Sequence, residues 1–348
     1  MHGKLPAEDP VLVVATHRNG AVDGFLLHAL MPELEFMLSA QLTRTWFQRL
    51  FFGGIGVKRQ KDGGGDNHAA IQCCEEHLLA GGSLCVFPEG TSALGPQHLP
   101  YHSGAARIAI AYWEKSGSCP PIIPIGLHYH DPESFRSSVE VVVGEPLHVS
   151  VPSLGACRRA IEEGLLKVGA NFSDSDHQEL AWLRARQETS VYQGLKQMEL
   201  PPGKESLAGW SSIPRRVRDL ALRATPARPG LLPLWLAPLL VPGIILHLPV
   251  LLVAALASRR MADAQNVIAL WKILGGTLAA FVWSPLLLLI AGMTAEWIGV
   301  FVVIAATALL LVLWNPVRTA WRNLRYLLAP ASARKAILHF SKVPLHHV

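Results

Sequence analysis

The sequence predicts an α/β fold, in which a mostly parallel sheet flanked by helices is followed by a helical segment and a C-terminal membrane-embedded helical region. Three observations predict it. Over residues 1–150, short apolar runs alternate with amphipathic stretches, as in strands joined by helices. Residues 153–200 have a polar, helical pattern. Residues 229–315 contain uncharged stretches long enough to cross a bilayer.

Six short apolar runs are the predicted strands of the sheet. Such runs suit strands whose two faces are both covered by helices. They are Pro10–Ala15, Leu34–Leu38, Ile55–Val57, Leu84–Phe87, Ile122–Leu127 and Val139–Val143. The helical patterns between them lie near residues 22–31, 43–51, 66–80 and 102–116.

The first apolar stretch of the C-terminal region, Leu231–Ala257, carries no charge but contains several prolines. Arginines lie on both sides of it, so by the positive-inside rule both of its ends prefer the cytoplasm. These features favour a bent or re-entrant membrane segment over a single straight span. The prolines are Pro233, Pro238, Pro242 and Pro249.

Two further apolar segments, Ile273–Ile290 and Trp297–Trp314, predict a transmembrane hairpin. The linker Gly292–Glu296 has no Lys or Arg, whereas Lys272 and the arginines from residue 318 onward flank the outer ends. This pattern places both outer ends, and with them the α/β domain, on the cytoplasmic side. The alternative is a buried helical hairpin of a soluble protein.

The charge pattern and the cysteines limit the classes of function. The chain has 31 Lys and Arg residues against 26 Asp and Glu, and the basic residues flank apolar runs instead of lying among aromatic residues. This is not the pattern of a nucleic-acid-binding surface. The five cysteines form no CxxC pair, which predicts free thiols in a reducing compartment. The first ten residues contain no apolar leader, so we expect no secretion signal there.

Polar residues that could do chemistry follow three of the predicted strands. Functional loops of a parallel α/β sheet leave the carboxyl ends of its strands. The three loops are Thr16–Gly24, Lys58–Arg59 and Pro88–Ser92.

His17 and Asp23 share the first of these loops, with five residues between them. A carboxylate that fixes one ring N–H of a histidine lets the other ring nitrogen take a proton, so the pair can act as a general base. The alternative is that His17 only forms a hydrogen bond and Asp23 caps the following helix. The spacing alone leaves both interpretations open.

The other two loops offer groups for an acceptor substrate. Lys58 and Arg59 are adjacent cations at a strand end, and a guanidinium can hold a phosphate through two parallel hydrogen bonds. Solvated surface charge is the alternative. Glu89 and Gly90 join a carboxylate to a residue that permits close backbone approach, which suits holding a polyol or positioning the base. An ordinary turn explains the same pair.

Several other chemistries lack their motifs. The sequence has no G-x-S-x-G elbow, no phosphate-binding P-loop and no His-Glu-x-x-His. His128 and His130 share one face of an extended segment, but no carboxylate at a convincing spacing completes a set of metal ligands. We therefore expect no catalytic metal.

Four blocks of the sequence resemble the glycerolipid acyltransferase superfamily, which includes glycerol-3-phosphate and lysophosphatidic acid acyltransferases. THRNGAVDG, GGIGVKRQ, VFPEGTS and IIPIGL stand in the order of its four motifs, and the resemblance covers residues 8–150. Most of the superfamily has four residues between the His and the Asp. The five found here look like the branch of yeast-type glycerol-3-phosphate/dihydroxyacetone-phosphate acyltransferases and their bacterial relatives. VPGIILHLPVLLVAAL and NVIALWKIL are similar to the membrane region of that branch.

The resemblance implies a membrane-bound O-acyltransferase of phospholipid biosynthesis that needs no cofactor. His17, oriented by Asp23, would deprotonate the acceptor hydroxyl, which then attacks the thioester of acyl-CoA or acyl carrier protein. The acceptor would be glycerol 3-phosphate, with dihydroxyacetone phosphate as a further acceptor, or alternatively a lysolipid such as lysophosphatidic acid. An inactive membrane scaffold is the alternative from another class. The implied acceptor-binding residues are Lys58 and Arg59 for the phosphate and Glu89, Gly90, Thr91 and Ser92 for the glycerol.

With this resemblance, the composition predicts five regions along the chain. They are an acyltransferase catalytic domain (1–150), a helical appendage (151–228), a Pro-rich bent or re-entrant membrane segment (229–258), a transmembrane helical hairpin (268–315) and a basic cytoplasmic tail (316–348).

Overall fold

The computed structural model describes most of the chain, and its contacts divide it into two compact units. The described residues are 1–6, 10–40, 53–58, 67–134, 136–186, 188, 190–199, 204–224 and 230–342. The first unit comprises Met1–His130 and Ser138–Asn171, and the second comprises Asp131–Ser137 and Phe172–Val348. The short loop 131–137 therefore belongs by its contacts to the second unit, although it connects two strands of the first.

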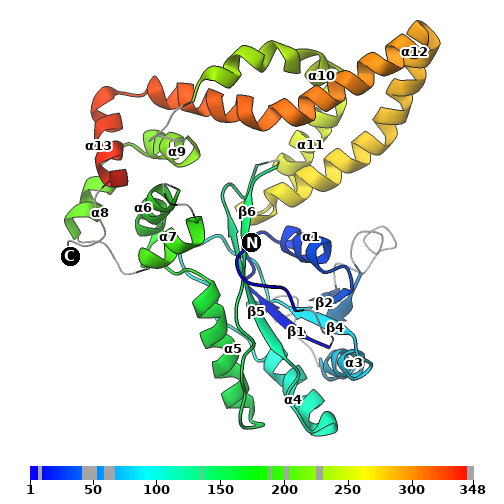
Figure 1. Ribbon diagram of the computed structural model, residues 1–348, viewed down its shortest axis with the longest axis vertical. Helices are drawn as coiled ribbons and strands as arrows, with labels where there is room; N and C mark the ends of the chain where they lie inside the picture. Colours follow the sequence, from blue (N-terminus) through cyan, green and yellow to red (C-terminus); the bar gives the residue numbers. More distant parts are fainter. Residues whose placement is uncertain are drawn as a thin grey trace. The chain divides into compact units, whose positions relative to one another are not determined.

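The first unit is built on a six-stranded, mostly parallel sheet with the order β3-β2-β4-β1-β5-β6 (Figure 1). Only β5 and β6 pair antiparallel. The central strand β1 lies between β4 and β5, with Val13 opposite Cys85 on one side and Ile123 on the other. The strands are β1 Leu12–Ala15, β2 Leu34–Ser39, β3 Ile55–Val57, β4 Ser83–Val86, β5 Ile122–Tyr129 and β6 Val139–Val143.

The central strands are buried along their whole length. Every residue of β1, β4 and β5 is buried, as expected for parallel strands that lie between helical layers. The unbroken apolar runs therefore predicted these strands correctly, and the predicted fold class is confirmed. The helices of this unit are α1 Ala21–Leu30, α3 His68–Leu79, α4 Gly104–Ser116 and α5 Leu154–Val168. The helix predicted over 43–51 lies outside the described residues.

Short polar helices form one part of the second unit. A core of buried residues holds α6, α8, α9 and α13 together, with Trp210 and Ile337 fully buried, and α7 packs on α6. Their bounds are α6 Ser175–Ala185, α7 Val191–Gln197, α8 Lys204–Ser211, α9 Arg215–Arg223 and α13 Ala331–Lys342.

The Pro-rich apolar stretch forms a sharply bent helical segment. It consists of η3 Leu232–Leu240, α10 Val241–Leu246 and α11 Leu248–Met261, and the axis bends by 81° between Leu246 and Leu248. Pro249 lies in the first turn of α11, where its missing N–H costs no intrahelical bond. The bend agrees with the shape expected from the prolines.

The last apolar region is the long helix α12, Ile268–Leu327, which is broken at Ala295 and Glu296. The chain reverses there (Figure 1), and Leu287 and Ala291 pack against Val303 from beyond the break. The break falls within the predicted linker of the hairpin.

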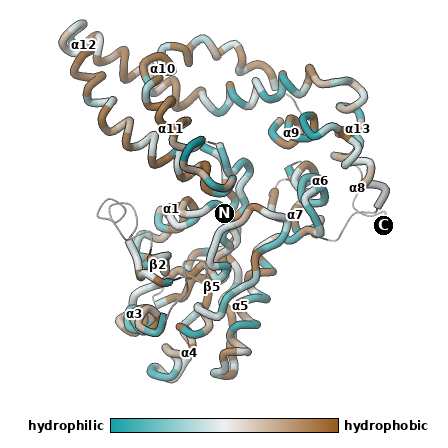
Figure 2. The backbone as a smooth tube through the Cα atoms, turned by 180° about the vertical axis from the view of Figure 1, so that it is seen from behind, coloured by the Kyte–Doolittle hydropathy of each residue, from teal (hydrophilic) through white to brown (hydrophobic). Residues whose placement is uncertain are grey.

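Large apolar side chains on these segments are exposed. Phe281, Trp297 and Ile298 are 81%, 85% and 75% exposed, and Figure 2 shows hydrophobic residues along α10, α11 and α12. Apolar surface of this extent marks a membrane or protein contact. By length and composition, one described helix can cross a membrane, or two spans result if the bent pair counts as one.

Candidate active site

The candidate site lies where β1 and β4 end side by side. Because these two parallel strands are neighbours in the sheet, the loops that follow them meet at one edge. The β1 loop carries His17 and Asp23, and the β4 loop carries Glu89 and the residues after it. The topology thus brings two of the three predicted loops together.

Asp23 meets His17 despite the five residues between them. Gly20, with φ of 58°, turns the chain so that Asp23 enters the first turn of α1. There its Oδ2 accepts hydrogen bonds from His17 Nδ1 at 2.9 Å, and from the backbone N–H groups of Arg18 at 2.7 Å and Asn19 at 2.8 Å. Asp23 is fully buried, so these donors replace water around its carboxylate.

Tyr129 completes the set of donors around Asp23. Its hydroxyl donates a hydrogen bond of 2.7 Å to Asp23 Oδ1 from the end of β5, the other neighbour of β1. Burial, together with the Asp23 charge, raises the pKa of Tyr129 well above its usual value, so Tyr129 keeps its proton. The sequence reasoning missed this residue, and its only signal there was a hydroxyl at the end of an apolar run.

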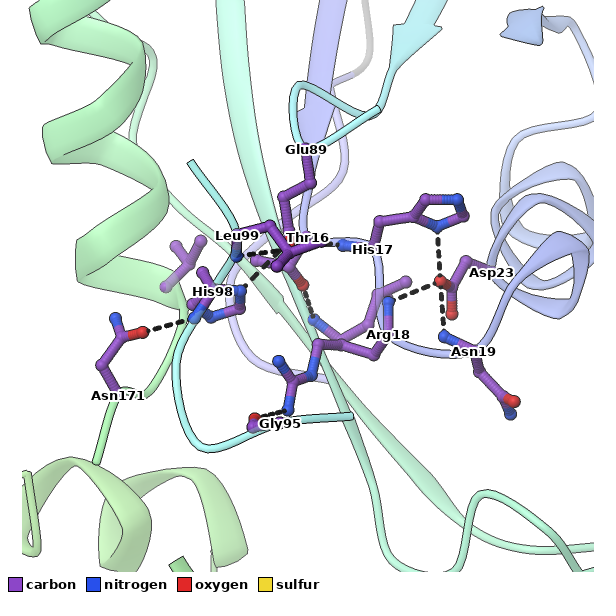
Figure 3. Close-up of polar contacts among 12 residues, drawn as sticks. Thr16, His17, Arg18, Asn19, Asp23, Glu89, Gly95, His98, Leu99 and Asn171 are labelled. Atoms are coloured by element: carbon purple, nitrogen blue, oxygen red, sulfur yellow. Dashed lines mark hydrogen bonds and ion pairs between the residues drawn. The ribbon is translucent and has the colours of Figure 1, made fainter. Parts of the chain in front are cut away.

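The imidazole of His17 is held in one orientation and stays partly open. Its ring stacks on Phe87, with centroids 4.3 Å apart, and its side chain is 17% exposed. Figure 3 shows one ring nitrogen facing Asp23 and the rest of the ring pointing away from the carboxylate. With Nδ1–H donated to Asp23, the Nε2 lone pair is left to accept a proton. This is the geometry that a general base requires.

Glu89 fixes the position of the His17 backbone. Its Oε1 accepts hydrogen bonds from His17 N–H at 2.8 Å and from His98 Nδ1 at 3.2 Å, and its Oε2 accepts from Leu99 N–H at 3.1 Å. Burial raises the pKa of Glu89, but the bond and charge of His98 and the two backbone donors outweigh it, so the net pKa is lowered. Since Glu89 is buried and both oxygens accept from protein donors, these contacts favour positioning the base over holding a polyol.

Arg18 and Asn171 secure the loop that follows Glu89. The Arg18 side chain donates to the carbonyl of Gly95 at 2.8 Å, and Asn171 accepts from the backbone N–H of His98 at 2.8 Å (Figure 3). Burial lowers the pKa of Arg18, and the charges of Glu89 and Asp23 oppose that shift. Neither Arg18 nor His98 was identified as a site residue from the sequence.

The remaining predicted site residues are Gly90, Thr91, Ser92, Lys58 and Arg59. Gly90 has φ of +67°, and a Cβ there would lie 3.0 Å from His102, so the turn requires glycine. Thr91 and Ser92 follow in the same loop and are partly exposed. Lys58 is exposed, and Arg59 lies outside the described residues.

Neither metal ligands nor reactive thiols accompany this site in the part of the chain that the structure describes. No group of three or more His, Cys, Asp or Glu residues there could hold a metal ion. All five cysteines are free thiols, as predicted. Burial raises the pKa of Cys74 and Cys157 to about 12 and of Cys119 to about 11, so these three are protonated at neutral pH.

Comparisons with known proteins point to one chemistry. Residues 1–128 match the family model described as Acyltransferase. The chain is 34% identical over 85 residues to Glycerol-3-phosphate O-acyltransferase 2 of Saccharomyces cerevisiae, which is 24% of this chain and 11% of that protein. It is 28% identical over 120 residues to a probable 1-acyl-sn-glycerol-3-phosphate acyltransferase of Mycoplasma pneumoniae, 33% of this chain and 43% of that protein. The chain thus spans less than half the length of either relative, and no solved structure matches it significantly.

Proposed function

We propose that this chain, whose residues 1–128 match the Acyltransferase family model, transfers an acyl group from acyl-CoA or acyl carrier protein to glycerol 3-phosphate. The general assignment to the glycerolipid acyltransferases, without a specified acceptor, is supported by the family match and by the yeast and bacterial relatives. The single observation that carries the proposed chemistry is the buried Asp23 carboxylate, which orients an accessible His17 imidazole.

The proposed reaction needs one base and no covalent enzyme intermediate. His17 Nε2 removes the proton of the acceptor hydroxyl while its oxygen forms a bond to the thioester carbonyl carbon. The tetrahedral intermediate collapses by breaking the carbon–sulfur bond, and the leaving thiolate takes the proton from the His17 imidazolium. Asp23 stabilises that imidazolium between the two steps, because its charge lies 2.9 Å from Nδ1.

In this proposal the acceptor phosphate binds to Arg59 with help from Lys58, and Thr91 and Ser92 contact the glycerol. Exposed Lys58 is compatible with an open phosphate site. Its backbone N–H donates to Asn67 Oδ1 at 2.9 Å and its carbonyl accepts from Asn67 Nδ2 at 2.8 Å, which fixes the chain at the end of β3.

The proposed location is the cytoplasmic face of a membrane. The bent segment η3–α11 and the two arms of α12 would lie in the bilayer, with the Ala295–Glu296 break on the far side. Lys272 and Arg318 flank the outer ends of the two arms, which favours the cytoplasm for both. An epitope inserted at the break should then be labelled from outside sealed cells, whereas one after residue 342 should not.

A second acceptor, lysophosphatidic acid, is supported by the bacterial relative, which is named as a probable 1-acyl-sn-glycerol-3-phosphate acyltransferase. An acceptor panel separates the two. The full chain in membranes is given labelled acyl-CoA with glycerol 3-phosphate, dihydroxyacetone phosphate or lysophosphatidic acid, and the products are separated. We expect product from glycerol 3-phosphate. Product only from the lysolipid would assign the chain to the second acylation step instead of the first.

The panel includes two histidine variants. His17→Ala should lose product with every acceptor, whereas His28→Ala removes an exposed histidine of helix α1 and should keep it. No product from the wild-type chain with any acceptor or donor would favour the inactive scaffold.

A further inference from the structure

The second unit contains a group of arginines that the acyl-transfer proposal does not use. They come from three parts of the chain: the end of α6, the last residue of α9 and the part of α12 beyond its apolar stretch. All of them lie near Asp131 or Glu133 of the loop 131–137. The members of this basic cluster are Arg186, Arg223, Arg318 and Arg322.

Two carboxylates of the loop face the basic cluster. Arg322 Nη2 lies 2.7 Å from Asp131 Oδ2 and 3.1 Å from Ser134 Oγ. Arg223 Nη2 lies 3.6 Å from Glu133 Oε2. Lys272 adds a further cation, since its Nζ donates to the Glu133 carbonyl at 2.7 Å. The carboxylates are thus outnumbered by the cations around them.

Arg186 lies within electrostatic range of Asp131, Arg322 and Arg223. Burial lowers its pKa to about 10; Asp131 opposes the shift, while Arg322 and Arg223 add to it. Arg318 lies within electrostatic range of the same Arg322 and Asp131. Like charges held together in a partly buried place favour an added anion, because buried charges are stable when paired.

The basic cluster is closed on one side and open on the other. The Arg322 and Asp131 side chains are 19% and 14% exposed, whereas the Arg223 side chain is 48% exposed. An anion therefore has access from the Arg223 side. Guanidinium groups are suited to phosphate, which they bind through charge-assisted, often bidentate hydrogen bonds.

The position along α12 indicates where that phosphate comes from. Arg318 and Arg322 lie four and eight residues after Trp314, the aromatic residue that ends the last apolar stretch. Aromatic residues at such a position mark the level of the lipid head groups. Basic pockets next to membrane helices at this level bind anionic head groups.

We propose that the basic cluster is a binding site for a phosphate group, supplied by the head group of an anionic glycerophospholipid. The inference rests on the membrane placement in the proposed function but not on the acyl transfer. A lipid bound there ties α6, α9 and α12 together at the membrane surface.

The test measures binding to the purified full chain in detergent. The probes are dihexanoyl phosphatidylglycerol, dihexanoyl phosphatidylcholine and inorganic phosphate; phosphatidylglycerol is chosen because it is neither substrate nor product of the proposed reaction. We expect phosphatidylglycerol to bind most tightly. Arg223→Gln and Arg186→Gln should each weaken it by about tenfold or more, since each removes a charged donor.

Arg325→Gln is the matched control. It removes the same charge from an exposed position one turn further along α12, outside the basic cluster, and should leave the affinity unchanged. The Arg223 side chain is about half exposed, so its replacement should leave the fold intact. The Arg223→Gln variant therefore provides the test if Arg186→Gln does not fold.

Three results would overturn the proposal. Equal affinity for phosphatidylglycerol and phosphatidylcholine would remove the preference for an anionic head group. An equal loss in Arg325→Gln would show a general effect of charge. Inorganic phosphate binding as tightly as phosphatidylglycerol would exclude the lipid as the source. Because no acyl transfer is measured, failure here is distinguishable from failure of the proposed reaction.

Discussion

Replacing Asp23 by asparagine separates the charge of this residue from its shape. Among the described residues, Asp23 Oδ2 accepts from His17 Nδ1 and two backbone N–H groups, whereas Oδ1 accepts from the Tyr129 hydroxyl. The amide of the Asp23→Asn variant would therefore place its oxygen toward the three donors and its NH₂ toward Tyr129, whose hydroxyl can rotate to accept. The Nδ1–H tautomer of His17 is kept, and only the negative charge is lost.

The size of the effect follows from the interactions lost. A hydrogen bond to a charged acceptor contributes about 1.5–3 kcal/mol, against about 0.5–1.5 for a neutral one. For charge centres about 4 Å apart, the carboxylate also attracts the imidazolium by about 4 kcal/mol at an effective dielectric constant of about 20. We expect Asp23→Asn to raise the barrier by about 2–4 kcal/mol, which lowers kcat by about 30- to 1000-fold.

The assay is the initial rate of acyl transfer from labelled acyl-CoA as the acceptor concentration is varied. The KM for the acceptor should change little, because Asp23 acts through His17. Glu33→Gln, which removes an exposed carboxylate shortly after α1, is the control and should keep the wild-type rate. A rate for Asp23→Asn within a few-fold of wild type would refute the role of the carboxylate. A loss near 10⁴-fold would show that the amide turned its NH₂ to the ring and fixed the wrong tautomer.

Three further predictions concern groups around the site. Tyr129→Phe should lower kcat by less than about tenfold, because Asp23 keeps its other donors, and should lower the thermal midpoint through the lost bond of about 1.5–3 kcal/mol; an unchanged midpoint would contradict it. Glu89→Gln turns an NH₂ toward a donor and should lower both kcat and thermal midpoint by more than Tyr129→Phe does; equal kcat values for Glu89→Gln and wild type would exclude the positioning role. Burial lowers the pKa of His128 to about 4 from 6.5, so the unfolded chain binds a proton between these pH values that the folded chain does not. Stability should fall by up to about 3 kcal/mol from pH 6.5 to 4, and the thermal midpoint of His128→Gln should depend less on pH over that range than that of the wild type. An equal pH dependence in this variant would show that another group causes the loss.

The central strands β1, β4 and β5 could be predicted because they are buried on both faces, and such strands leave apolar runs, as in Leu12–Ala15. Short apolar runs also located the partly exposed strands β2, β3 and β6. The prolines of residues 233–249 lie where the helical axis bends, and the linker between the two apolar segments contains the break in α12. In these places a local feature of the sequence determines the local structure.

The partners within the site could not be predicted from the sequence, because they come from distant parts of the chain. Tyr129 reaches Asp23 only because β5 lies next to β1, and His98 reaches Glu89 only through the path of the loop after β4. A hydroxyl or imidazole at such a position has no spacing that identifies it. The contact of Asp23 with His17 was open for a related reason, since it depends on the positive φ of Gly20.

The central claim is that His17 is the base of an acyl transfer, and one comparison of rates tests it most directly. Purified wild-type chain and His17→Ala are assayed with labelled acyl-CoA and glycerol 3-phosphate at matched amounts of folded protein in membranes. The account predicts labelled acylated glycerol phosphate from the wild type and a rate lower by several orders of magnitude from the variant. Near-normal turnover by His17→Ala would contradict it.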